Sequence, residues 1–381
     1  MSLLPTVSPS AGRYSNRVAL KPSESTPGPD DLVRARALIL RYGWNSTVYQ
    51  ILNPGIRLWF SAAGDAVVGY SAQRGVQVVV GAPVCAETRL AEVAREFEAA
   101  ASRKGARVCY FSSEGRLEAV YHENPGYAQV LLGAQPVWNP QTWEARFEVQ
   151  ASLRAQRNRA RNKGVGVRLW PSAHAHDHPA LAACLREWLS SKRLPPLHFM
   201  VEPYTLGQLA DRRVFVAERN AAVVGFLVAS PVPQRSGWLI EQVIRERAAP
   251  NGTAELLIDQ AMRTLGAEGS TYATLGVVPL AERPELQSVA SPFWLRLLLR
   301  WLRAHGRRFY NFEGLEFFKA KFQPLRWDPV YAISNEPHFS PKTLYAVAAA
   351  FSQGAPLALV GQALGNAVRD EVSALKRRLS R

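Results

Sequence analysis

Residues 237–277 read GWLIEQVIRERAAPNGTAELLIDQAMRTLGAEGSTYATLGV, and this stretch decides the fold. The apolar run at 237–243 predicts a strand, residues 254–265 have the apolar spacing of a helix, and residues 272–277 predict a second strand. Strand, helix and strand in this order are typical of an α/β sheet with helices on its faces.

The same plan is predicted on either side of this stretch. Upstream, strands are predicted at 213–219 and 222–230, joined by a turn at Asn220, with a helix near 179–191 before them. The first half of the chain predicts a helix at 31–42, strands at 57–61, 66–71 and 76–81, a helix at 91–104 and a strand at 108–112. The sequence therefore predicts two like-folded halves with mixed sheets, separated by a linker near 138–150.

Composition indicates a globular chain with a polyanionic partner. The 381 residues include 46 Lys and Arg against 31 Asp and Glu, a net charge of +15, and 47% are hydrophobic. A field of this sign concentrates RNA, acidic lipid or phosphorylated cofactors, although an arginine-rich genome would explain the same number. Cys85, Cys109 and Cys184 lie far apart and not beside histidines, so we expect buried thiols in a reducing cytosol, with no zinc or other metal site.

The two ends of the chain differ from its middle. Residues 1–30 carry Pro, Ser and Gly without the apolar region of a signal peptide, and we expect a disordered leader. No run approaches the roughly 18 apolar residues that a membrane-spanning helix requires. In residues 336–381, apolar positions from Leu357 to Leu379 recur every three or four residues among basic ones, which predicts an amphipathic helix. Such a helix lies on anionic membrane or packs on the protein's own core, and the sequence leaves both open.

A dense basic segment spans residues 154–168. It contains Arg154, Arg157, Arg159 and Arg161, with no acidic residue among them. Because a solvated protein face usually mixes both signs of charge, this density favours contacts with phosphates of RNA or lipid headgroups.

The loop before the helix at 254–265 is a second candidate. Asn251 and Gly252 open the helix, where free backbone N–H groups and the helix dipole favour phosphate. N-acetyltransferase folds hold a pyrophosphate at this place with a glycine-rich loop that this sequence matches only in part. An ordinary turn with a capped helix is the plain alternative.

The third candidate is the aromatic run at 309–324, which reads FYNFEGLEFFKAKFQP. It contains Tyr310, Glu313, Lys319 and Lys321. In an extended chain the two lysines share a face, whereas in a helix they diverge. By composition alone, an aromatic core with solvated lysines is the default.

The motif Tyr-Asn-Phe-x-Gly-Leu-x-x-Phe-Lys-x-Lys-Phe-x-Pro at 310–324 resembles the closing motif of the phosphatidylglycerol lysyltransferase family, the soluble catalytic region of multiple-peptide-resistance-factor proteins. Pro-Asn-Gly-Thr at 250–253, with the acidic Glu241 nine positions earlier, is similar to a second motif of that family. Tyr-Gly-Trp-Asn at 42–45, Gly-Ala-Pro at 81–83 and the basic segment stand in matching order, so the resemblance covers about residues 30–335.

Three features depart from the family pattern. Glu241 stands where the family usually has Asp, and Ile244 stands where it has Arg, with Arg245 the nearest arginine. Ala82 replaces a common acidic residue. The membrane-spanning flippase half of many members has no counterpart in these residues, so we do not expect lipid flipping.

The resemblance implies an α/β fold of two tandem GNAT-like (acyl-CoA N-acyltransferase-like) domains at 31–145 and 146–335, followed by the helical tail. It also implies a transferase that moves an aminoacyl group from aminoacyl-tRNA to a membrane lipid, without a cofactor. We expect a cytoplasmic protein at the inner face of the membrane. The sequence leaves the amino acid, the lipid and the oligomeric state open.

The resemblance also suggests roles for individual residues. We expect Glu241 to hold the α-amino group or deprotonate the nucleophile, and Lys319 and Lys321 to stabilise negative charge or a terminal phosphate. Arg245 and Arg247 would bind phosphate. Tyr310 and Glu313 are secondary candidates.

Two other functions remain as alternatives. One is an acyl-CoA-dependent N-acyltransferase on the same fold, in which the loop at Asn251 and Gly252 would hold pyrophosphate. The other is an RNA- or membrane-binding protein that has kept the fold and lost the chemistry, which the departures at Glu241 and Ala82 leave open.

Overall fold

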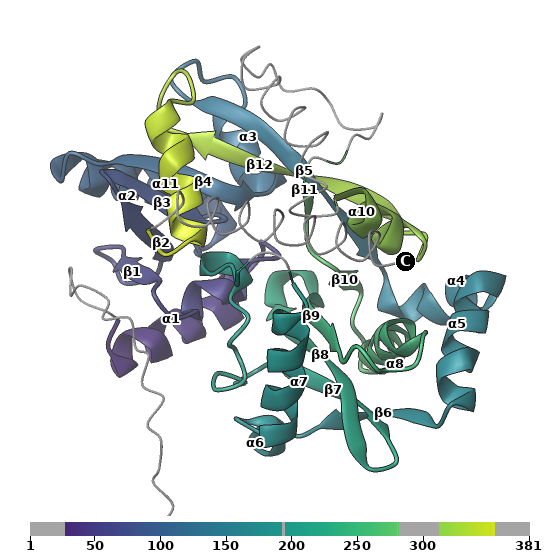
Figure 1. Cartoon of the computed structure of the whole chain (residues 1–381). Coiled ribbons are helices and arrows are strands. Elements are labelled where there is room, and N and C mark those ends of the chain that lie inside the picture. The colour runs from purple at the N-terminus through teal and green to yellow at the C-terminus, as the bar shows by residue number, and fades with distance from the viewer. Residues whose placement is uncertain (1–26, 193–194, 280, 282–311, 355–381) are drawn as a thin grey trace, which may run out of the picture.

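The structure is a computed structural model, and it describes residues 27–192, 195–279, 281 and 312–354 (Figure 1). Strands and helices alternate along the N-terminal part of the chain. Its elements are α1 (Pro29–Tyr42), η1 (Val48–Leu52), β1 (Arg57–Phe60), β2 (Val67–Gln73), β3 (Val76–Val80), η2 (Glu87–Arg89), α2 (Leu90–Arg103), β4 (Arg107–Ser113), α3 (Gly115–Tyr121) and β5 (Ala128–Trp138).

The remaining described elements continue the alternation. They are η3 (Pro140–Thr142), α4 (Trp143–Glu148), α5 (Ala151–Asn162), β6 (Val165–Trp170), α6 (Ser172–Ala175), α7 (Pro179–Ser190), η4 (Phe199–Val201), β7 (Arg213–Arg219), β8 (Ala222–Val232), η5 (Pro233–Arg235), β9 (Gly237–Arg245), α8 (Thr253–Ala267), β10 (Tyr272–Thr274), β11 (Val278–Pro279), α10 (Phe312–Ala320), β12 (Arg326–Ser334) and α11 (Pro341–Phe351).

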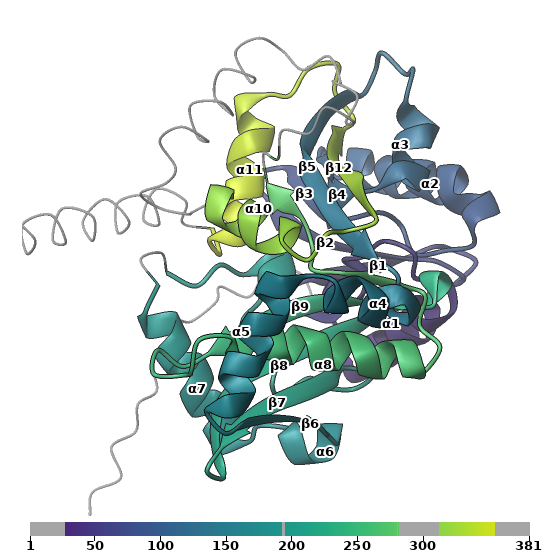
Figure 2. The ribbon, with the colours of Figure 1, turned by 90° about the vertical axis from the view of Figure 1, so that its right-hand side faces the viewer.

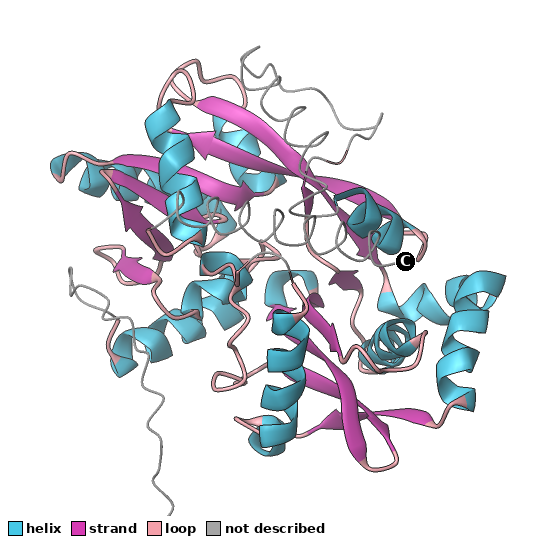
Figure 3. Ribbon diagram, viewed as in Figure 1, coloured by secondary structure: helices cyan, strands magenta, loops and turns pink. Residues whose placement is uncertain are grey.

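One sheet connects both halves of the described chain. Its strand order is β1-β2-β3-β4-β12-β5-β10-β9-β8-β7-β6, and β11 pairs with β5 outside this path. Helices flank the sheet (Figure 3). The predicted α/β class with a mixed sheet is therefore confirmed.

The same local plan occurs twice in this sheet. In β2–β3–α2–β4, two antiparallel strands lead into a helix and then into a strand parallel to the second. The segment β8–β9–α8–β10 repeats this order. Each helix is a crossover between two neighbouring parallel strands, which is how parallel pairs are connected in proteins.

β12 joins the C-terminal part of the chain to the first half. It lies between β4 and β5 and pairs antiparallel with both. Farther along, α11 packs against β2 and β3. The division of the chain near residue 145 stays a prediction. In space, however, β12 and α11 lie with the strands of the first half, although they follow the second half in the sequence.

The segment at 138–150 is not an exposed linker. It forms η3 and α4, and the side chains of Trp143 and Phe147 are 2% exposed, in the core that α8 covers. Pro140 and Pro136 interrupt the sequence pattern there, but Pro140 begins a short helix, a position that tolerates its missing N–H. The place of the linker near 138–150 therefore stays a prediction, and the segment that it names is helical and packed in the core.

The three cysteines are free and buried, as expected. Burial raises the pKa of each thiol above its ordinary value. Within the described ranges, no helix is long and apolar enough to cross a bilayer. Residues 1–26 of the expected leader and the apolar stripe from Leu357 onward lie outside the described residues.

Candidate functional site

A β-bulge in β9 places Glu241. Val228 of β8 pairs with Gln242, and Ala229 pairs with Ile240, so Glu241 is the extra residue between them. Bulges bend a strand and redirect side chains, and they are frequent beside functional sites.

The bulge turns Glu241 away from α8. Ile240 packs in the same core cluster as Leu256 of α8. Glu241 instead contacts Arg212 and Gln50, on the face of β9 opposite α8. The carboxylate therefore belongs to the junction between the two halves of the chain.

Both carboxylate oxygens of Glu241 accept hydrogen bonds. Nε of Arg212 donates to Oε1 at 2.7 Å, and Nε2 of Gln50 donates to Oε2 at 2.6 Å. Arg212 is 2% exposed, and its remaining donors reach the carbonyl of Gln208 at 2.5 Å and Oδ1 of Asn53 at 3.3 Å. Glu241 is thus held in one orientation from two sides.

Four buried acceptors without partners belong to residues that contact Glu241 or Arg212 or lie close to them in the chain. Oε1 of Gln50, Oε1 of Gln242, Oε1 of Gln208 and Oγ1 of Thr205 are buried and have no hydrogen-bond partner among the described residues. Gln50 bonds to Glu241 directly, Gln242 follows it in the chain, and Gln208 bonds to Arg212. Because a buried polar group without a partner costs about 1–3 kcal/mol, this arrangement favours a ligand that donates several hydrogen bonds.

The parallel strands β9 and β10 part just before Glu241. Their pairing ends at Thr274 and Leu239, and the predicted strand at 272–277 is correspondingly shorter than expected. Beyond Leu239, the edge of β9 has no strand partner on that side in the described chain. In this register Gly276 stands at the level of Glu241, two residues past the last pair.

Lys319 holds the chain after β10. Its Nζ donates to the carbonyls of Leu275, Gly276 and Val277 at 2.7, 2.8 and 3.0 Å. An ammonium has three donors, so none is left for a substrate oxygen in this arrangement. Burial lowers the pKa of Lys319 to about 7, while the three carbonyls act in the opposite direction by favouring the charged form. This arrangement suits a positioning role for Lys319, and its expected contact with negative charge stays a prediction.

Lys321 points to a different partner. It follows the end of α10, and its Nζ donates to Oε1 of Glu255 in the first turn of α8 at 2.5 Å. The ammonium also lies 4.0 Å from the ring centroid of Phe318. The closing motif is thus helical from Phe312 to Ala320, and its two lysines diverge as the helical alternative predicted.

Gly252 lets the loop before α8 touch α5. Its φ is +97°, and a Cβ at this position would lie 1.9 Å from the carbonyl oxygen of Gln156 in α5. Figure 2 shows α5 crossing α8, against which it packs. Three features therefore lie together near the beginning of α8: the arginine-rich helix α5, the candidate phosphate-binding loop at Asn251 and Gly252, and the Lys321–Glu255 pair.

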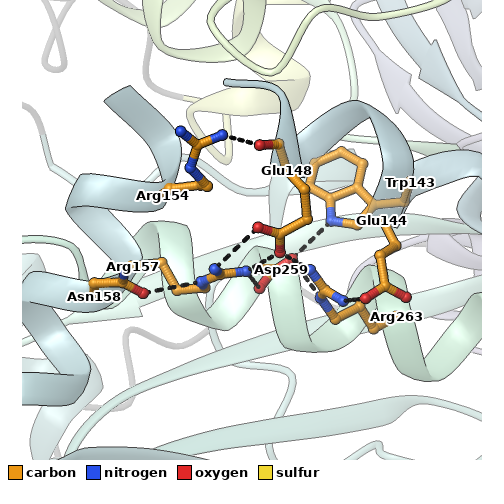
Figure 4. A network of polar contacts seen from close by, with 8 residues as sticks. All are labelled: Trp143, Glu144, Glu148, Arg154, Arg157, Asn158, Asp259 and Arg263. Carbon is orange, nitrogen blue, oxygen red and sulfur yellow. Dashed lines mark hydrogen bonds and ion pairs between the residues drawn. The ribbon is translucent and has the colours of Figure 1, made fainter. Parts of the chain in front are cut away.

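Arg157 does not face solvent. It is 8% exposed and pairs with Oε1 of Glu148 at 2.5 Å and with Oδ2 of Asp259 at 3.4 Å (Figure 4). Asp259 is fully buried and also accepts from Nε1 of Trp143 and Nε of Arg263. The expectation that Arg157 binds phosphate is therefore corrected, because its guanidinium forms an ion pair that connects α5 with Asp259 of α8.

The other expected arginines are more accessible. Arg154 is half-buried and donates to the carbonyl of Glu148, while Arg159 and Arg161 are exposed on α5. Arg245 is exposed at the end of β9, and the backbone N–H of the exposed Arg247 donates to Glu187 at 2.9 Å.

Three further candidates differ in how much the structure says about them. Asn251 is exposed beside Gly252, and Glu313 is exposed in the first turn of α10. Tyr310 lies outside the described residues. Sequence reasoning missed Arg212 and Gln50, because neither residue stands in a motif that marks it as buried.

Two groups of candidates thus occupy different faces of β9. Gly252, Lys321 and the exposed arginines of α5 lie on the α8 side, and Glu241 lies on the other. The open edge of β9 is between them. Among the described residues, no group of three or more His, Cys, Asp or Glu side chains is arranged to hold a metal ion.

Known proteins match this chain over most of its length. A family profile described as phosphatidylglycerol lysyltransferase, C-terminal, matches residues 36–334. The phosphatidylglycerol lysyltransferase of Bacillus subtilis is 24% identical over 277 residues, which are 70% of this chain and 31% of that protein. The lysylphosphatidylglycerol biosynthesis bifunctional protein LysX of Nocardia farcinica is 26% identical over 305 residues, 77% of this chain and 26% of that protein. This chain thus spans about a third or less of these two relatives.

Solved structures share the fold. The C-terminal domain of a candidate lysylphosphatidylglycerol synthetase from Agrobacterium fabrum has a TM-score of 0.73 at 21% identity, covering 85% of this chain and 98% of that one. L-PGS from Bacillus licheniformis has a TM-score of 0.70 at 21% identity, covering 87% and 98%. These likenesses confirm the predicted α/β fold, and the family profile confirms the resemblance seen in the sequence: the chain belongs to the phosphatidylglycerol lysyltransferase C-terminal family.

Proposed function

We propose that this protein transfers an aminoacyl group from aminoacyl-tRNA to a hydroxyl group of an anionic membrane lipid, with phosphatidylglycerol as the first candidate acceptor. Membership of the family and the relative from Bacillus subtilis support lysyl transfer to phosphatidylglycerol. The identity of the amino acid and the use of aminoacyl-tRNA as its donor are the parts of this proposal that the assay below must test.

The carboxylate of Glu241 and the unpaired acceptor beside it carry the proposal. An aminoacyl ester has an ammonium group with three donors, and a lysyl group has a second one. The fixed carboxylate of Glu241 and the unpaired amide oxygen of Gln50, which contacts it, match such a group. The amine acceptor of an acyl-CoA-dependent N-acyltransferase would also bring an ammonium, so the choice of donor rests on family membership and on the assay below.

The reaction is an ester exchange. The lipid hydroxyl oxygen attacks the ester carbonyl carbon, a new C–O bond forms, and the C–O bond to the tRNA ribose breaks. The hydroxyl proton ends on the ribose oxygen, and nothing is oxidised or reduced. Because one ester replaces another, much of the acceleration comes from holding the two substrates in register.

The described residues suggest where each part would lie. The ammonium would bind beside Glu241, and the ester would reach the open edge of β9, where the strands part. Glu255 accepts one of the three donors of Lys321, which leaves others for the carbonyl oxygen that becomes negative in the transition state.

The tRNA backbone would follow the exposed cations. Arg159 and Arg161 on α5 lie near the loop of Asn251 and Gly252, where the beginning of α8 adds backbone N–H groups. A net charge of +15 also favours a peripheral position on the inner, anionic face of the membrane, which we include in the proposal.

A transfer assay tests the proposal. Aminoacyl-tRNAs labelled in the amino acid are mixed with the protein and with vesicles containing phosphatidylglycerol or only phosphatidylcholine. We expect labelled lipid only with phosphatidylglycerol, its loss after RNase treatment, and no response to acyl-CoA. Transfer that depends on CoA and survives RNase would instead establish the N-acyltransferase alternative, and binding of tRNA without turnover would establish the non-catalytic one.

Two variants link the assay to the site. Glu241→Gln keeps the shape of the side chain and removes its charge, so we expect at least a tenfold loss of transfer. Glu268→Gln removes a surface partner of Arg213 and serves as the matched control, with unchanged transfer expected. Equal activity of both variants and the wild type would remove Glu241 from the mechanism.

A further inference from the structure

A histidine and a glutamate form a polar pair across η4, outside the contacts described so far. Nδ1 of His198 lies 2.7 Å from Oε2 of Glu202, four positions later in the chain. The side chain of Glu202 is 5% exposed, whereas that of His198 is 21% exposed. Oε1 of Glu202 accepts from the backbone N–H of Tyr204 at 3.1 Å, so this carboxylate is held from two sides while the imidazole stays partly accessible.

Gln242 connects this pair to the residue that precedes it on β9, Glu241. Its Nε2 donates to the backbone carbonyls of Glu202 and Pro203, both at 3.1 Å. Val243, the next residue, packs against the core cluster of α8, so Gln242 points to the opposite face of β9. That face also carries the contacts of Glu241. The segment with the histidine therefore borders the candidate site.

The backbone at Phe199 makes a second connection. Its φ is +67° although its side chain is bulky and 2% exposed, a conformation that such residues rarely adopt and that is frequent at functional sites. Nδ2 of Asn53 donates to the carbonyl of Phe199 at 3.0 Å. Oδ1 of Asn53 accepts from Arg212, the partner of Glu241. The turn that directs His198 is thus held by the same network as the candidate carboxylate.

The contact with Glu202 determines which ring nitrogen of His198 is free. An ionised carboxylate only accepts hydrogen bonds, so Nδ1 carries the proton. In the neutral ring Nε2 then has a lone pair, and it has no hydrogen-bond partner among the described residues. A neutral imidazole that a carboxylate orients in this way is suited to act as a general base.

We propose that His198 is the general base of the transfer reaction and that Glu202 positions it, an inference that rests on the function proposed above. Nε2 of His198 takes the proton of the acceptor hydroxyl while the hydroxyl oxygen attacks the ester carbonyl carbon. The imidazolium then gives this proton to the ribose oxygen as the C–O bond to the ribose breaks. Glu241 is left to hold the ammonium group of the donor, so the two carboxylates have different tasks.

The charged groups around His198 determine how the reaction depends on pH. η4 packs against η1 and α11. Apart from Lys342, at the far end of α11, these two helices contain no His, Lys, Arg, Asp or Glu, and their titratable groups are Tyr49 and Tyr345. On the β9 side, the ion pair described above carries no net charge. Glu202 is therefore the charged group that faces the ring, and it favours the protonated form. Because the base must be neutral, transfer should be lost as the pH falls.

Single-turnover transfer to phosphatidylglycerol vesicles between about pH 5.5 and 7.5 tests the proposal. The wild-type rate should fall about tenfold per pH unit at the acid end. His198→Gln should lack this fall and be at least about 100-fold slower at the upper pH, with unchanged affinity for aminoacyl-tRNA in filter binding. Glu202→Gln removes the charge that favours the imidazolium, so its fall should begin at lower pH.

The pair of His122 and Glu118 offers a matched control. Nδ1 of His122 lies 2.5 Å from Oε1 of Glu118, also four positions away, but the side chain of His122 is 61% exposed. His122→Gln should therefore transfer at the wild-type rate throughout the pH range. Added imidazole should restore part of the rate of His198→Ala and have no effect on His122→Ala, a difference that a purely structural role of His198 would not produce.

The outcomes distinguish this role from the proposed function itself. A wild type that forms no aminoacyl lipid would refute the transfer function, and the role of His198 with it. An active wild type beside an equally active His198→Gln, or a folded His198→Ala that imidazole does not rescue, would refute the role of His198 alone. Should both His198 variants fail to fold, the wild-type profile decides, and a rate that does not change with pH over this range would overturn the proposal.

Discussion

Nε of Arg212 donates to Oε1 of Glu241 at 2.7 Å. Nε2 of Gln50, a residue of the first half of the chain, donates to the other carboxylate oxygen, Oε2. The guanidinium also lies 4.9 Å from the ring centroid of Tyr49, another residue of η1. This ion pair thus joins β9 to η1 as well as placing a carboxylate at the edge of the sheet. A residue expected only to touch substrate also stabilises the junction between the two halves.

Replacing Glu241 should therefore affect stability as well as transfer. Glu241→Ala leaves Arg212 buried without its counter-ion, and breaking a buried pair costs about 3–5 kcal/mol. We expect a loss of about 3 kcal/mol in the free energy of unfolding, measured with urea. Glu268→Ala breaks an exposed pair and should cost less than about 1 kcal/mol. Similar small losses in both variants would show that the Arg212 pair contributes little.

The helices α1, α2, α7 and α8 and most strands could be predicted from the sequence because their signals are local, whereas α4 and α5 were not predicted. Residues 213–219 form β7 as predicted, and α1 and α8 differ from prediction by a few residues at their ends. The position of β12 could not be predicted, since its pairing with β4 and β5 joins residues about 200 positions apart. Local periodicity carries no information on such partners.

The candidate site was predictable only in part. Gly252, Lys321 and the basic segment lie near one another, but a bulge turns Glu241 to the other face of β9. Register within a strand decides which face a side chain takes, and an inserted residue changes it without a clear mark in the sequence.

Arg157 should behave differently from its neighbours in α5. The buried residues of this helix are Leu153, Arg157 and Ala160, which are spaced as one face of a helix. The helical period of the sequence therefore indicated that Arg157 faces the core. Arg157→Met leaves the buried Asp259 with one fewer cation, and we expect a loss of about 2–4 kcal/mol in the free energy of unfolding. The exposed Arg161→Met is the control, with a change within about 0.5 kcal/mol. Urea unfolding of both variants measures the difference, and equal losses would contradict a structural role for Arg157.

Arg159 and Arg161 should instead govern RNA affinity. Both side chains are exposed on α5. The double variant Arg159→Gln/Arg161→Gln should bind tRNA more weakly, and the slope of log affinity against log salt should fall by about 1 for each lost phosphate contact. Filter binding at several salt concentrations measures both quantities. The exposed pair Arg103→Gln/Lys104→Gln, at the end of α2, removes the same charge elsewhere; an equal fall in slope would mean that tRNA responds only to net charge.

Gly252 should tolerate no side chain. Alanine there meets both a φ of +97° and the carbonyl of Gln156, whereas Gly269 has a φ of +91° and open space around it. Gly269→Ala should cost about 1–2 kcal/mol for the backbone conformation alone. We expect Gly252→Ala to cost clearly more and to weaken tRNA binding, because α5 must move away from the loop. Thermal unfolding and filter binding measure the two effects, and equal costs at the two glycines would show that the contact with α5 yields easily.

Lys319 should give the protein a characteristic pH dependence. Its pKa is about 7 in the folded protein and about 10.5 in a solvated lysine, so between these values the unfolded chain binds more protons than the folded one. The free energy of unfolding contributed by Lys319 therefore rises with pH over this range and falls as pH drops toward 7. Lys319→Met removes this titration together with the bonds to the three carbonyls, so its deficit relative to the wild type should widen from pH 6.5 to pH 9.5. Urea unfolding at both pH values measures the deficit, with the exposed Lys104→Met as the control for a lost surface charge. A deficit that stays constant would mean that the carbonyls of Leu275, Gly276 and Val277 keep the ammonium charged throughout.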